Sequence, residues 1–461
     1  MKQILSAIIL GLVLFFSGCS VGPDFQKPQY DTLQTFRYDS IKTDSTTSVD
    51  WWNLFNDPKI RWLVNTALQN NKDLKIAAAR IEQANAMLTF IGADRYPALN
   101  YNIQAGRGTY ANGTKLPSPA NAFSIMPTLS WELDFWGKYR RATEAARAQL
   151  LATKYAYTSV KLDLISLVIS NYFLLLDFKN RLEITKATLE SRKESFEIIK
   201  KRFEHGIVPE IDVNQAQIQM DIAASNVPNL QRAVAQTENA LSVLLGKNPG
   251  EIDTGLSLME QSVSEEIPVG IPSDVLRHRP DVLRAENLLH AQNAKIGVAV
   301  SRLFPSFNLG LLGGYAGNEL STLFSGNPAW LIGGSIVGPI FNFNKNISNI
   351  EVEKAKTKEA LYNYQNTVLN AFREVEDALV ELNTYKKELK VKEQQVEAAK
   401  NAVMLSRKRY DQGVTSFLEV LESERILFDS ELQLSSIKAS YLSSYIKLYK
   451  AIGGGWNIEN K

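Results

Sequence analysis

The chain has 461 residues, enough for two or three ordinary domains, and its net charge of +2 gives no argument for a nucleic-acid partner. Its single cysteine excludes a disulfide framework and a CxxC metal site. The three histidines (His205, His278 and His290) are too scattered to predict a metal centre, and no phosphate loop, GxSxG elbow or HExxH motif is present. We therefore predict neither an enzyme nor a cofactor or metal site.

The amino terminus has the pattern of a secretion signal. Lys2 precedes an apolar run over residues 4–16, and Ser-Gly then leads into Cys19. Thirteen residues rise only about 20 Å as a helix, too little to span a bilayer. A basic start, a short apolar run and small residues predict a signal peptide over 1–18. Because the cleavage site abuts the only cysteine, it resembles a bacterial lipoprotein box, with Cys19 acylated and Ser20 directing the protein to the outer membrane.

The first half of the mature chain, 57–250, contains strand-like sequence ahead of its long helical segment. After Pro97 apolar and polar residues alternate, and they alternate again from Phe123. This period predicts strands at about 98–110 and 122–136, each with one polar face. Between them we expect a turn-rich loop from Asn112 through Pro119.

Two long segments contain no helix breaker. Residues 139–205 and 346–412 each span 67 positions without Gly or Pro, or about 100 Å if helical. Apolar residues recur every seven positions in both, which predicts supercoiled helices. The members are Leu182, Leu189, Phe196 and Phe203, and then Leu389, Val396, Val403 and Tyr410. The first segment continues into a helical hairpin over about 139–245 with its tip near Gly206, and Pro228 predicts a kink or break in the returning helix.

The second half, 272–461, follows a linker at 251–271 and repeats the first. RFEHGIVPEIDV starts at Arg202 and RYDQGVTSFLEV at Arg409, which is 207 residues later. Each stretch places a Gly where a helix can end in a left-handed turn. The second repeat thus predicts strands at about 306–316 and 329–343, and a hairpin at about 346–452 with its tip near Gly413. The last strand is Gly-rich, and its facing is not set by its sequence. The chain is an internal duplication.

Four strands predict an incomplete membrane barrel. An open sheet edge in hydrocarbon leaves backbone groups unpaired, so several chains must share one barrel. Two chains give eight strands, with an interior filled by side chains, and three give twelve, with room for a pore. The predicted fold class is α+β: a shared transmembrane β-barrel continuous with a long α-helical barrel. Aromatic residues suit its rims (Trp131, Trp136 and Trp330), and polar residues suit a water-filled lumen: Asn100, Asn102, Gln104, Ser130, Glu132 and Asp134.

Ordered motifs now match a known family over essentially the whole mature chain. They are Val-Gly-Pro-Asp-Phe from Val21, Trp-Trp-x-x-Phe-x-Asp-Pro from Trp51, Asn-x-Asp-Leu from Asn71, Leu-Asp-Phe-Trp-Gly-Lys from Leu133, and Ile-Pro-Ser from Ile271 leading to Arg-Pro-Asp-Val from Arg279. The chain resembles the TolC-like outer membrane factors, and most of all their lipoprotein branch. In this resemblance residues 19–56 form a lipidated, extended amino-terminal segment.

The resemblance implies a homotrimeric, passive channel-tunnel of a tripartite efflux pump in the outer membrane of a Gram-negative cell, with a periplasmic extension. A periplasmic adaptor (membrane fusion protein) and an inner-membrane transporter of RND type are the implied partners. The adaptor is expected to dock at the tips near Gly206 and Gly413 and to join the channel to the transporter. Two alternatives stay open, namely the outer-membrane channel of a type I protein secretion system and a coiled-coil lipoprotein scaffold without a pore. The sequence does not select a cargo among drugs, metal ions, siderophores and peptides.

The resemblance also implies a periplasmic gate just beyond the tips. Leu418 and Glu422 share one helix face at a spacing of four, and Glu419 lies beside Leu418. In the first hairpin Asp212 is the corresponding acid. Three copies of Glu422 would form an acidic ring that attracts cations. An Arg that locks some relatives is replaced by Thr415, and the alternative is that these acids lie on a solvated helix face.

Overall fold

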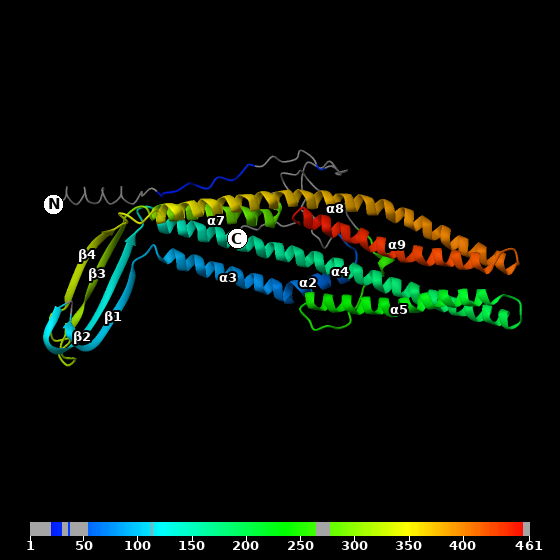
Figure 1. The fold of residues 1–461 in the computed structure, drawn as a ribbon, viewed down its shortest axis with the longest axis horizontal. Coiled ribbons are helices and arrows are strands. Elements are labelled where there is room, and N and C mark those ends of the chain that lie inside the picture. The colour runs from blue at the N-terminus through cyan, green and yellow to red at the C-terminus, as the bar shows by residue number, and fades with distance from the viewer. Residues whose placement is uncertain (1–19, 30–35, 37–53, 112–113, 264–276, 455–461) are drawn as a thin grey trace. The chain divides into compact units, whose positions relative to one another are not determined.

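The structure is a computed structural model that describes residues 20–29, 36, 54–111, 114–263 and 277–454. Cys19, Trp51, Trp52, the Asn112-Gly113 pair and the Ile-Pro-Ser motif lie outside these residues. Twelve elements follow in the order α2 (Pro58–Asn70), α3 (Lys72–Ala93), β1 (Ala98–Ala111), β2 (Thr114–Leu133), α4 (Lys138–Glu204), α5 (Glu210–Leu244), η2 (Leu258–Glu260), α7 (Pro280–Ser301), β3 (Ser306–Gly317), β4 (Ala329–Val337), α8 (Lys345–Asp411) and α9 (Phe417–Ala451) among the described residues (Figure 1).

Contacts divide the chain into two units. The first contains residues 1–29, 79–154 and 284–366, and the second contains 30–78, 155–283 and 367–461. The whole sheet belongs to the first unit, and both hairpin tips belong to the second. Among the described residues α4 alone is long and apolar enough to cross a membrane, but 56% of its most apolar stretch is buried, as in a core helix.

The four strands form one antiparallel sheet in the order β1-β2-β3-β4. Paired residues of neighbouring strands share a face, so the register decides which side chains lie together. Asn100 pairs with Thr128, Thr128 with Leu312, and Leu312 with Leu331. The face they define is made of polar residues, Gly and a few aliphatic residues, and its polar members are Asn100, Asn102, Gln104, Ser124, Thr128, Ser130, Glu132, Asn308 and Ser335.

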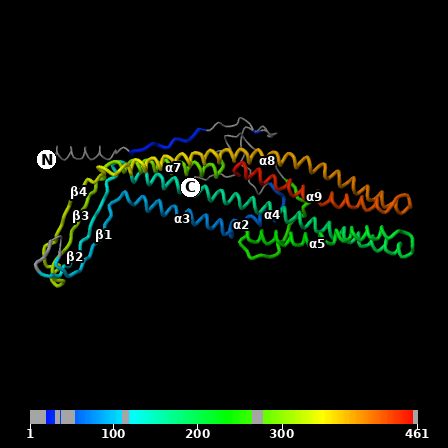
Figure 2. Tube along the Cα trace, viewed as in Figure 1, coloured from blue at the N-terminus to red at the C-terminus, as the bar shows by residue number. Residues whose placement is uncertain are grey.

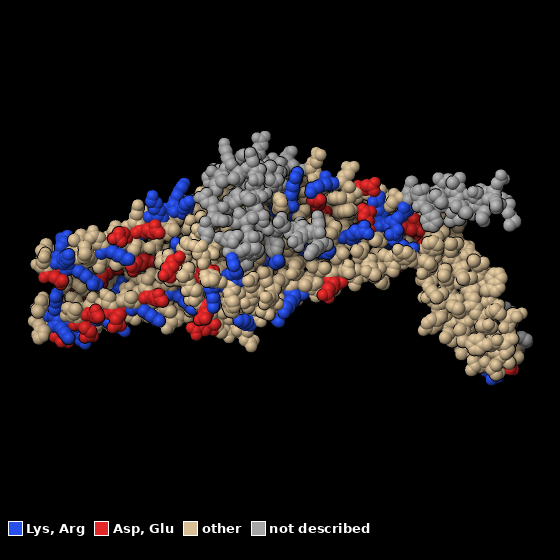
Figure 3. All heavy atoms as spheres, turned by 180° about the vertical axis from the view of Figure 1, so that it is seen from behind, with Lys and Arg blue, Asp and Glu red and all other residues tan. Residues whose placement is uncertain are grey.

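The opposite face of the sheet is apolar. Tyr101 pairs with Pro127, Leu129 with Leu311, and Leu311 with Ile332. Tyr101, Trp330 and Ile332 are exposed in the single chain, at 79%, 72% and 68%. In the view of Figure 3 the sheet is almost free of charged side chains, whereas the helices carry charges of both signs. The register also fixes the facing of β4, which its sequence left open: Trp330, Ile332 and Ile336 lie on the apolar face.

Two strand boundaries differ from the sequence prediction. β2 starts at Thr114, so the loop expected through Pro119 is largely strand. The prolines are tolerated there because β2 pairs with β3 only from Phe123, so the edge before it needs no donors. β4 ends at Val337 and not near residue 343, because Gly338 and Pro339 follow and Phe343 and Asn344 take positive φ before α8.

Asp134 also departs from its predicted place in the lumen. The strand ends at Leu133, and the Asp134 carboxylate accepts the backbone N–H groups of Tyr139 and Arg140 at 3.0 and 2.9 Å. It therefore caps the start of α4, where a carboxylate is favoured by unpaired amides. Glu132 keeps its place on the polar face and pairs with Lys138 at 2.9 Å.

The two hairpins are equal in length and offset by 207 residues. α4 and α8 each have 67 residues, and α5 and α9 each have 35. Figure 2 shows the two hairpins running side by side with their tips at one end. α5 continues through Pro228, so the helix has no break there, and the kink that the sequence also predicts stays a prediction. Proline removes one helical hydrogen bond and costs about 3 kcal/mol, and packing of the flanking turns, with Ala223 and Leu230 buried, holds the helix together.

Two of the family motifs close the far ends of these hairpins. Asn71 caps α3 through the Leu74 amide and donates its own amide to the Leu244 carbonyl at the end of α5, both at 3.0 Å. Arg279 donates to the Ala451 carbonyl at the end of α9 at 2.8 Å. One terminal carbonyl of each returning helix is thereby satisfied by a side chain in both repeats.

Candidate functional site

Both hairpin tips have the same backbone geometry. Gly206 and Gly413 have φ of +70° and +73°. The Ile207 amide donates to the Arg202 carbonyl, and the Val414 amide donates to the Arg409 carbonyl, both at 2.9 Å. These are Schellman motifs, which need a left-handed residue that glycine adopts at little cost. A Cβ on either glycine would meet nothing within 4 Å, so the backbone angle alone requires glycine.

An apolar cluster lies directly behind the tips. It joins Ile199 of α4 and Ala216 of α5 to Phe417, Val420 and Leu421 of α9, all at most 6% exposed. Tyr410 at the end of α8 packs against the same group, with its ring 5.3 Å from that of Phe417. The cluster therefore ties the first hairpin to the second.

Glu422 is not an isolated acid. Arg425 donates to both of its carboxylate oxygens, at 3.0 and 2.6 Å, and also pairs with Asp429 at 3.2 Å. Hydrogen bonds from Arg425 hold the pKa of Glu422 below its ordinary value. The Glu422 side chain is 52% exposed, so solvent is free to screen the pair.

A groove between α5 and α9 brings corresponding residues of the two repeats together. Gln215, Ile218 and Gln219 line one side, and Leu418, Leu421 and Glu422 line the other. Gln215 is the counterpart of Glu422, 207 residues earlier, so these two corresponding polar residues line the same groove, together with Gln219. Leu418 is 57% exposed. The structure thus brings the predicted gate residues Leu418 and Glu422 together.

Glu419 does not line this groove and contacts residues of the tip instead. It accepts a hydrogen bond from Thr415 and pairs with Arg409 at 3.2 Å. Thr415 is thereby a partner of the first turn of α9. Asp212 lies at the matching place in the first turn of α5, half-buried, but it does not line the groove.

Sequence reasoning missed the basic partners at the tips. Arg425 follows Glu422 by three positions, which is a helical spacing for an ion pair, so the sequence alone could have predicted this pair. Arg407, which binds Glu424 at 2.6 Å and Ser191 at 3.1 Å, depends on contacts between helices and left no sequence signal. Among the residues that the structure describes, no group of three or more His, Cys, Asp or Glu could hold a metal ion.

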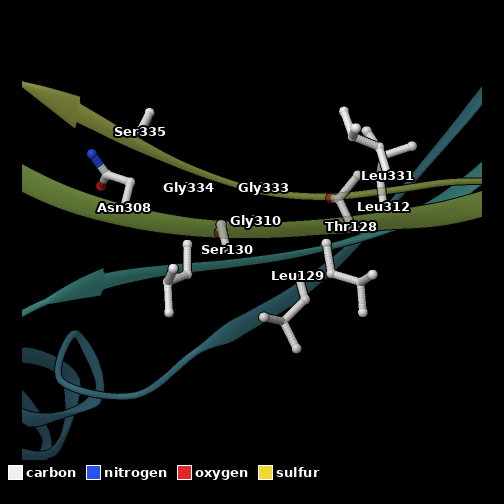
Figure 4. A pocket seen from close by; sticks show the side chains of 12 residues that line it. Thr128, Leu129, Ser130, Asn308, Gly310, Leu312, Leu331, Gly333, Gly334 and Ser335 are labelled. Carbon is white, nitrogen blue, oxygen red and sulfur yellow. The ribbon is translucent and has the colours of Figure 1, made fainter. Parts of the chain in front are cut away.

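The polar face of the sheet is the second candidate surface. Thr128, Ser130, Asn308, Gly310, Gly333 and Ser335 line a hollow there, together with aliphatic neighbours. Figure 4 shows Asn308 and Ser335 on the adjacent strands β3 and β4, and the register pairs them directly. Small and polar residues leave room for water along this face, which suits the wall of an aqueous pore.

Comparison with known proteins agrees with this geometry. The sequence model of the outer membrane efflux protein family matches residues 63–247 and 271–454, one stretch in each repeat. The chain belongs to the outer membrane efflux protein family. SrpC, a solvent efflux pump outer membrane protein of Pseudomonas putida, is 34% identical over 464 residues that cover 97% of each chain. CusC, a cation efflux system protein of Escherichia coli, is 31% identical over 451 residues, 96% of this chain and 98% of the relative.

Solved structures carry the fold of this family as well. The CmeC outer membrane channel of Campylobacter jejuni matches with a TM-score of 0.90 at 28% identity, over 96% of both chains. Membership confirms the predicted fold class and an outer-membrane efflux channel as the function. The family consists of channels and not of enzymes.

Proposed function

We propose that three copies of this chain form one twelve-stranded barrel and a continuous, passive efflux tunnel. The supporting observation is the sheet itself, whose outer strands β1 and β4 each pair on one side only within the chain. In hydrocarbon such edges cost several kcal/mol for each unpaired backbone group. The apolar face suits lipid and the polar face suits a lumen, and twelve strands leave the lumen open.

The tunnel requires partners that supply energy and select cargo. Relatives named as outer membrane proteins of efflux pumps support a tripartite assembly, with a periplasmic adaptor at the tips near Gly206 and Gly413 and an RND-type inner-membrane transporter beyond it. The chain acts as a conduit, and Cys19 carries the lipid anchor. Because relatives are named for solvents and for cations, the fold leaves the class of cargo to the transporter.

The gate proposed at the tips differs from a bare acidic ring. Leu418 and Glu422 from each copy, with Gln215 from the other repeat, line the narrow end of the tunnel. Arg425 partly neutralises Glu422, so the ring combines a hydrophobic constriction with paired charges. Glu419 and Asp212 act in the first turns of α9 and α5, where a negative charge favours the helix start.

The test uses the full-length protein purified in a mild detergent. We expect a trimer by native mass spectrometry and conductance in planar bilayers bathed in KCl. A monomer under gentle conditions would overturn the trimer, and a trimer without conductance would favour the coiled-coil scaffold. Conductance combined with export of a polypeptide, and not of small molecules, by the reconstituted system would favour the type I secretion channel.

A further inference from the structure

The turn between β2 and α4 is covered by residues of the other repeat. The Trp136 indole stacks on the Phe304 ring, with centroids 4.4 Å apart and an angle of 22° between the planes. Its Nε1 donates to the Pro305 carbonyl at 2.9 Å. We call this contact of Trp136 with Phe304 and Pro305 the aromatic clamp. Because Pro305 directly precedes β3, the aromatic clamp fastens the end of β2 to the start of β3.

The same backbone turn recurs between β4 and α8. Gly137 has a φ of +75°, and Asn344, which stands 207 residues later, has a φ of +62°. The Arg141 amide donates to the Gly137 carbonyl, and the Ser348 amide donates to the Asn344 carbonyl, both at 2.8 Å. Asparagine is one of the few residues other than glycine that adopt such a left-handed angle readily. The two turns therefore share one backbone geometry.

The aromatic residue of the second turn is exposed in the single chain. Phe343 stands 207 residues after Trp136 and is 86% exposed. Phe341, whose ring centre lies 4.5 Å from that of Phe343, is also exposed, and so is Ile340. A group of large apolar side chains in contact with solvent marks a surface that another molecule covers.

The counterparts of Phe304 and Pro305 lie at the opposite edge of the sheet. They are Tyr96 and Pro97, which stand 208 residues earlier and directly precede β1. The Tyr96 side chain is exposed as well. Because β1 and β4 are the two outer strands, the sheet itself separates Phe343 from the Tyr96 of the same chain.

A second copy of this chain brings the two edges together. In the twelve-stranded barrel proposed above, β4 of one copy pairs with β1 of the next copy, as β2 pairs with β3 within one copy. Strand β4 runs towards the turn at Asn344, and β1 starts just after Tyr96. Since the two strands pair in antiparallel fashion, Phe343 and the Tyr96 of the next copy lie at the same end of the sheet.

The faces of the sheet agree with this pairing. Adding 207 to a β2 position and subtracting 208 from its β3 partner converts each intrachain pair into an interchain pair. The result is Ile336 opposite Ile103 of the next copy, and Ser335 opposite Gln104. Ile336 and Ile103 both lie on the apolar face, whereas Ser335 and Gln104 both lie on the polar face. A register shifted by one residue would set apolar against polar side chains.

From this correspondence we propose that Phe343 of each copy packs on Tyr96 of the next copy, as an interchain counterpart of the aromatic clamp. The proposal rests on the trimeric channel proposed above, and a second copy of this chain is the partner. The contact fastens the end of β4 to the start of the neighbouring β1 at the three places where the intrachain clamp does not reach. Because phenylalanine has no N–H group, the interchain contact lacks the hydrogen bond that Trp136 makes to a backbone carbonyl.

Photo-cross-linking in the full-length protein tests the contact. Replacing Phe343 by p-benzoylphenylalanine should join one copy to the tryptic peptide between Arg95 and Arg107 of the next copy, giving covalent dimers and trimers in denaturing gels. Replacing Trp136 in the same way should give links within one chain and leave the monomer mass. In a protein that is trimeric and conducts KCl, adducts of position 343 with phospholipid, or with other peptides alone, would overturn the proposal. An unmodified protein that neither trimerises nor conducts would instead overturn the channel on which it rests.

Heating the trimer in a mild detergent, with native mass spectrometry as the readout, measures what the contact contributes. Phe343→Ser and Tyr96→Ser should each lower the dissociation temperature, and the double variant should lose no more than the larger single loss, because both remove one contact. Serine keeps a Cβ, so the strain of the φ of +48° at position 343 is unchanged.

The variant that copies the first repeat gives the sharpest result. Phe343→Trp should raise the dissociation temperature above that of the native protein, since an indole N–H can donate to the Pro97 carbonyl of the next copy. Phe324→Ser, which removes an aromatic ring that is 63% exposed in the loop between β3 and β4, should leave the temperature unchanged. Losses that add in the double variant, or a loss of equal size in Phe324→Ser, would overturn the proposal.

Discussion

Arg425 donates hydrogen bonds to both oxygens of the Glu422 carboxylate, at 3.0 and 2.6 Å, from about one turn further along α9. A bidentate guanidinium pair fixes the orientation of the carboxylate as well as compensating its charge. Three copies of Glu422 around a tunnel therefore repel each other less than three bare acids would. In the proposed gate, the net charge therefore depends on Arg425 as well as on Glu422.

Removing Arg425 should strengthen cation binding at the gate. In Arg425→Ala the Glu422 carboxylates lose their compensating charge, and divalent cations should block KCl conductance at lower concentration. Glu422→Ala should weaken the block. Planar bilayer titrations with MgCl₂ measure both effects. Lys193→Ala removes a similarly exposed pair with Glu190 on α4 and serves as the control. Equal block in the three variants and the native protein would remove Glu422 from the gate.

The same pair predicts how cation block depends on pH. Arg425 holds the pKa of Glu422 below its ordinary value. As pH falls, the Glu422 carboxylate therefore keeps its negative charge to a lower pH than an ordinary carboxylate would. In Arg425→Ala this pKa returns upward, and divalent block should disappear at a higher pH than in the native protein. The measurement is the block of KCl conductance by MgCl₂ over a series of acidic buffers, which gives the pH midpoint of block for the variant and for the native protein. A shift of the midpoint to lower pH in the variant would contradict the assignment.

Asp177 should make the stability of the folded chain depend on pH, with a contribution that falls as pH rises. Burial raises the pKa of this carboxyl, which is 3% exposed and accepts a hydrogen bond from Ser435. The folded state therefore binds a proton more readily than the unfolded state, and the contribution of Asp177 to stability falls as pH rises from about the ordinary carboxyl pKa of 3.9.

The matching variant is Asp177→Asn, which cannot ionise. Its unfolding temperature relative to the native protein should rise between acidic and neutral pH. Ser435→Ala should lower stability by about 1–3 kcal/mol, because a buried carboxylate loses one of its donors and keeps only Arg181 at 3.5 Å. Ser440→Ala, which removes a local bond to the Ser436 carbonyl, is the control. A temperature difference for Asp177→Asn that does not change with pH would contradict this prediction.

Most of the fold follows from local patterns in the sequence. The long helices are predictable because residues 139–205 contain no breaker, and the 207-residue offset fixes both tips. The faces of β1 and β2 follow from alternation. The start of β2 was missed because prolines in a half-paired strand look like a loop. The contact of Asp177 with Ser435 could not be predicted, because it joins two residues that are 258 positions apart in the sequence.

The tip glycines should be required for their backbone angle alone. Gly413→Ala forces a left-handed φ of +73° on a residue with a Cβ, at about 1–2 kcal/mol. Gly206→Ala should behave alike. Gly92→Ala in α3 is the control, since its Cβ also meets nothing within 4 Å but the residue is helical, and there alanine should stabilise by about 0.5–1 kcal/mol. Thermal unfolding in detergent should shift down for the tips and up for Gly92→Ala. A downward shift of equal size for all three would mean that the angle is not the cause.

The segment that follows Cys19 is held by contacts in the first unit that the Val-Gly-Pro-Asp-Phe motif supplies. The Val21 amide donates to the Trp136 carbonyl at 3.1 Å, and Arg141 binds the Gly22 carbonyl and the Asp24 carboxylate. Gly22 has φ of +93°, and a Cβ there would lie 2.5 Å from the Gly297 Cα. Close approach of two backbones thus requires glycine at position 22.

Gly22→Ala should therefore detach this segment without unfolding the chain. A loss of about 1.4 kcal/mol from its local stability speeds exchange at the Val21 amide about tenfold. Hydrogen–deuterium exchange on a peptide covering 20–27 measures the effect. Arg141→Ala should give the same loss of protection by a different route, since it removes the donor and leaves the close approach intact. Gly326→Ala, whose Cβ would meet nothing within 4 Å, should leave exchange unchanged. Native protection in Gly22→Ala would mean that the segment is anchored by the lipid at Cys19 and not by its packing on α4 and α7.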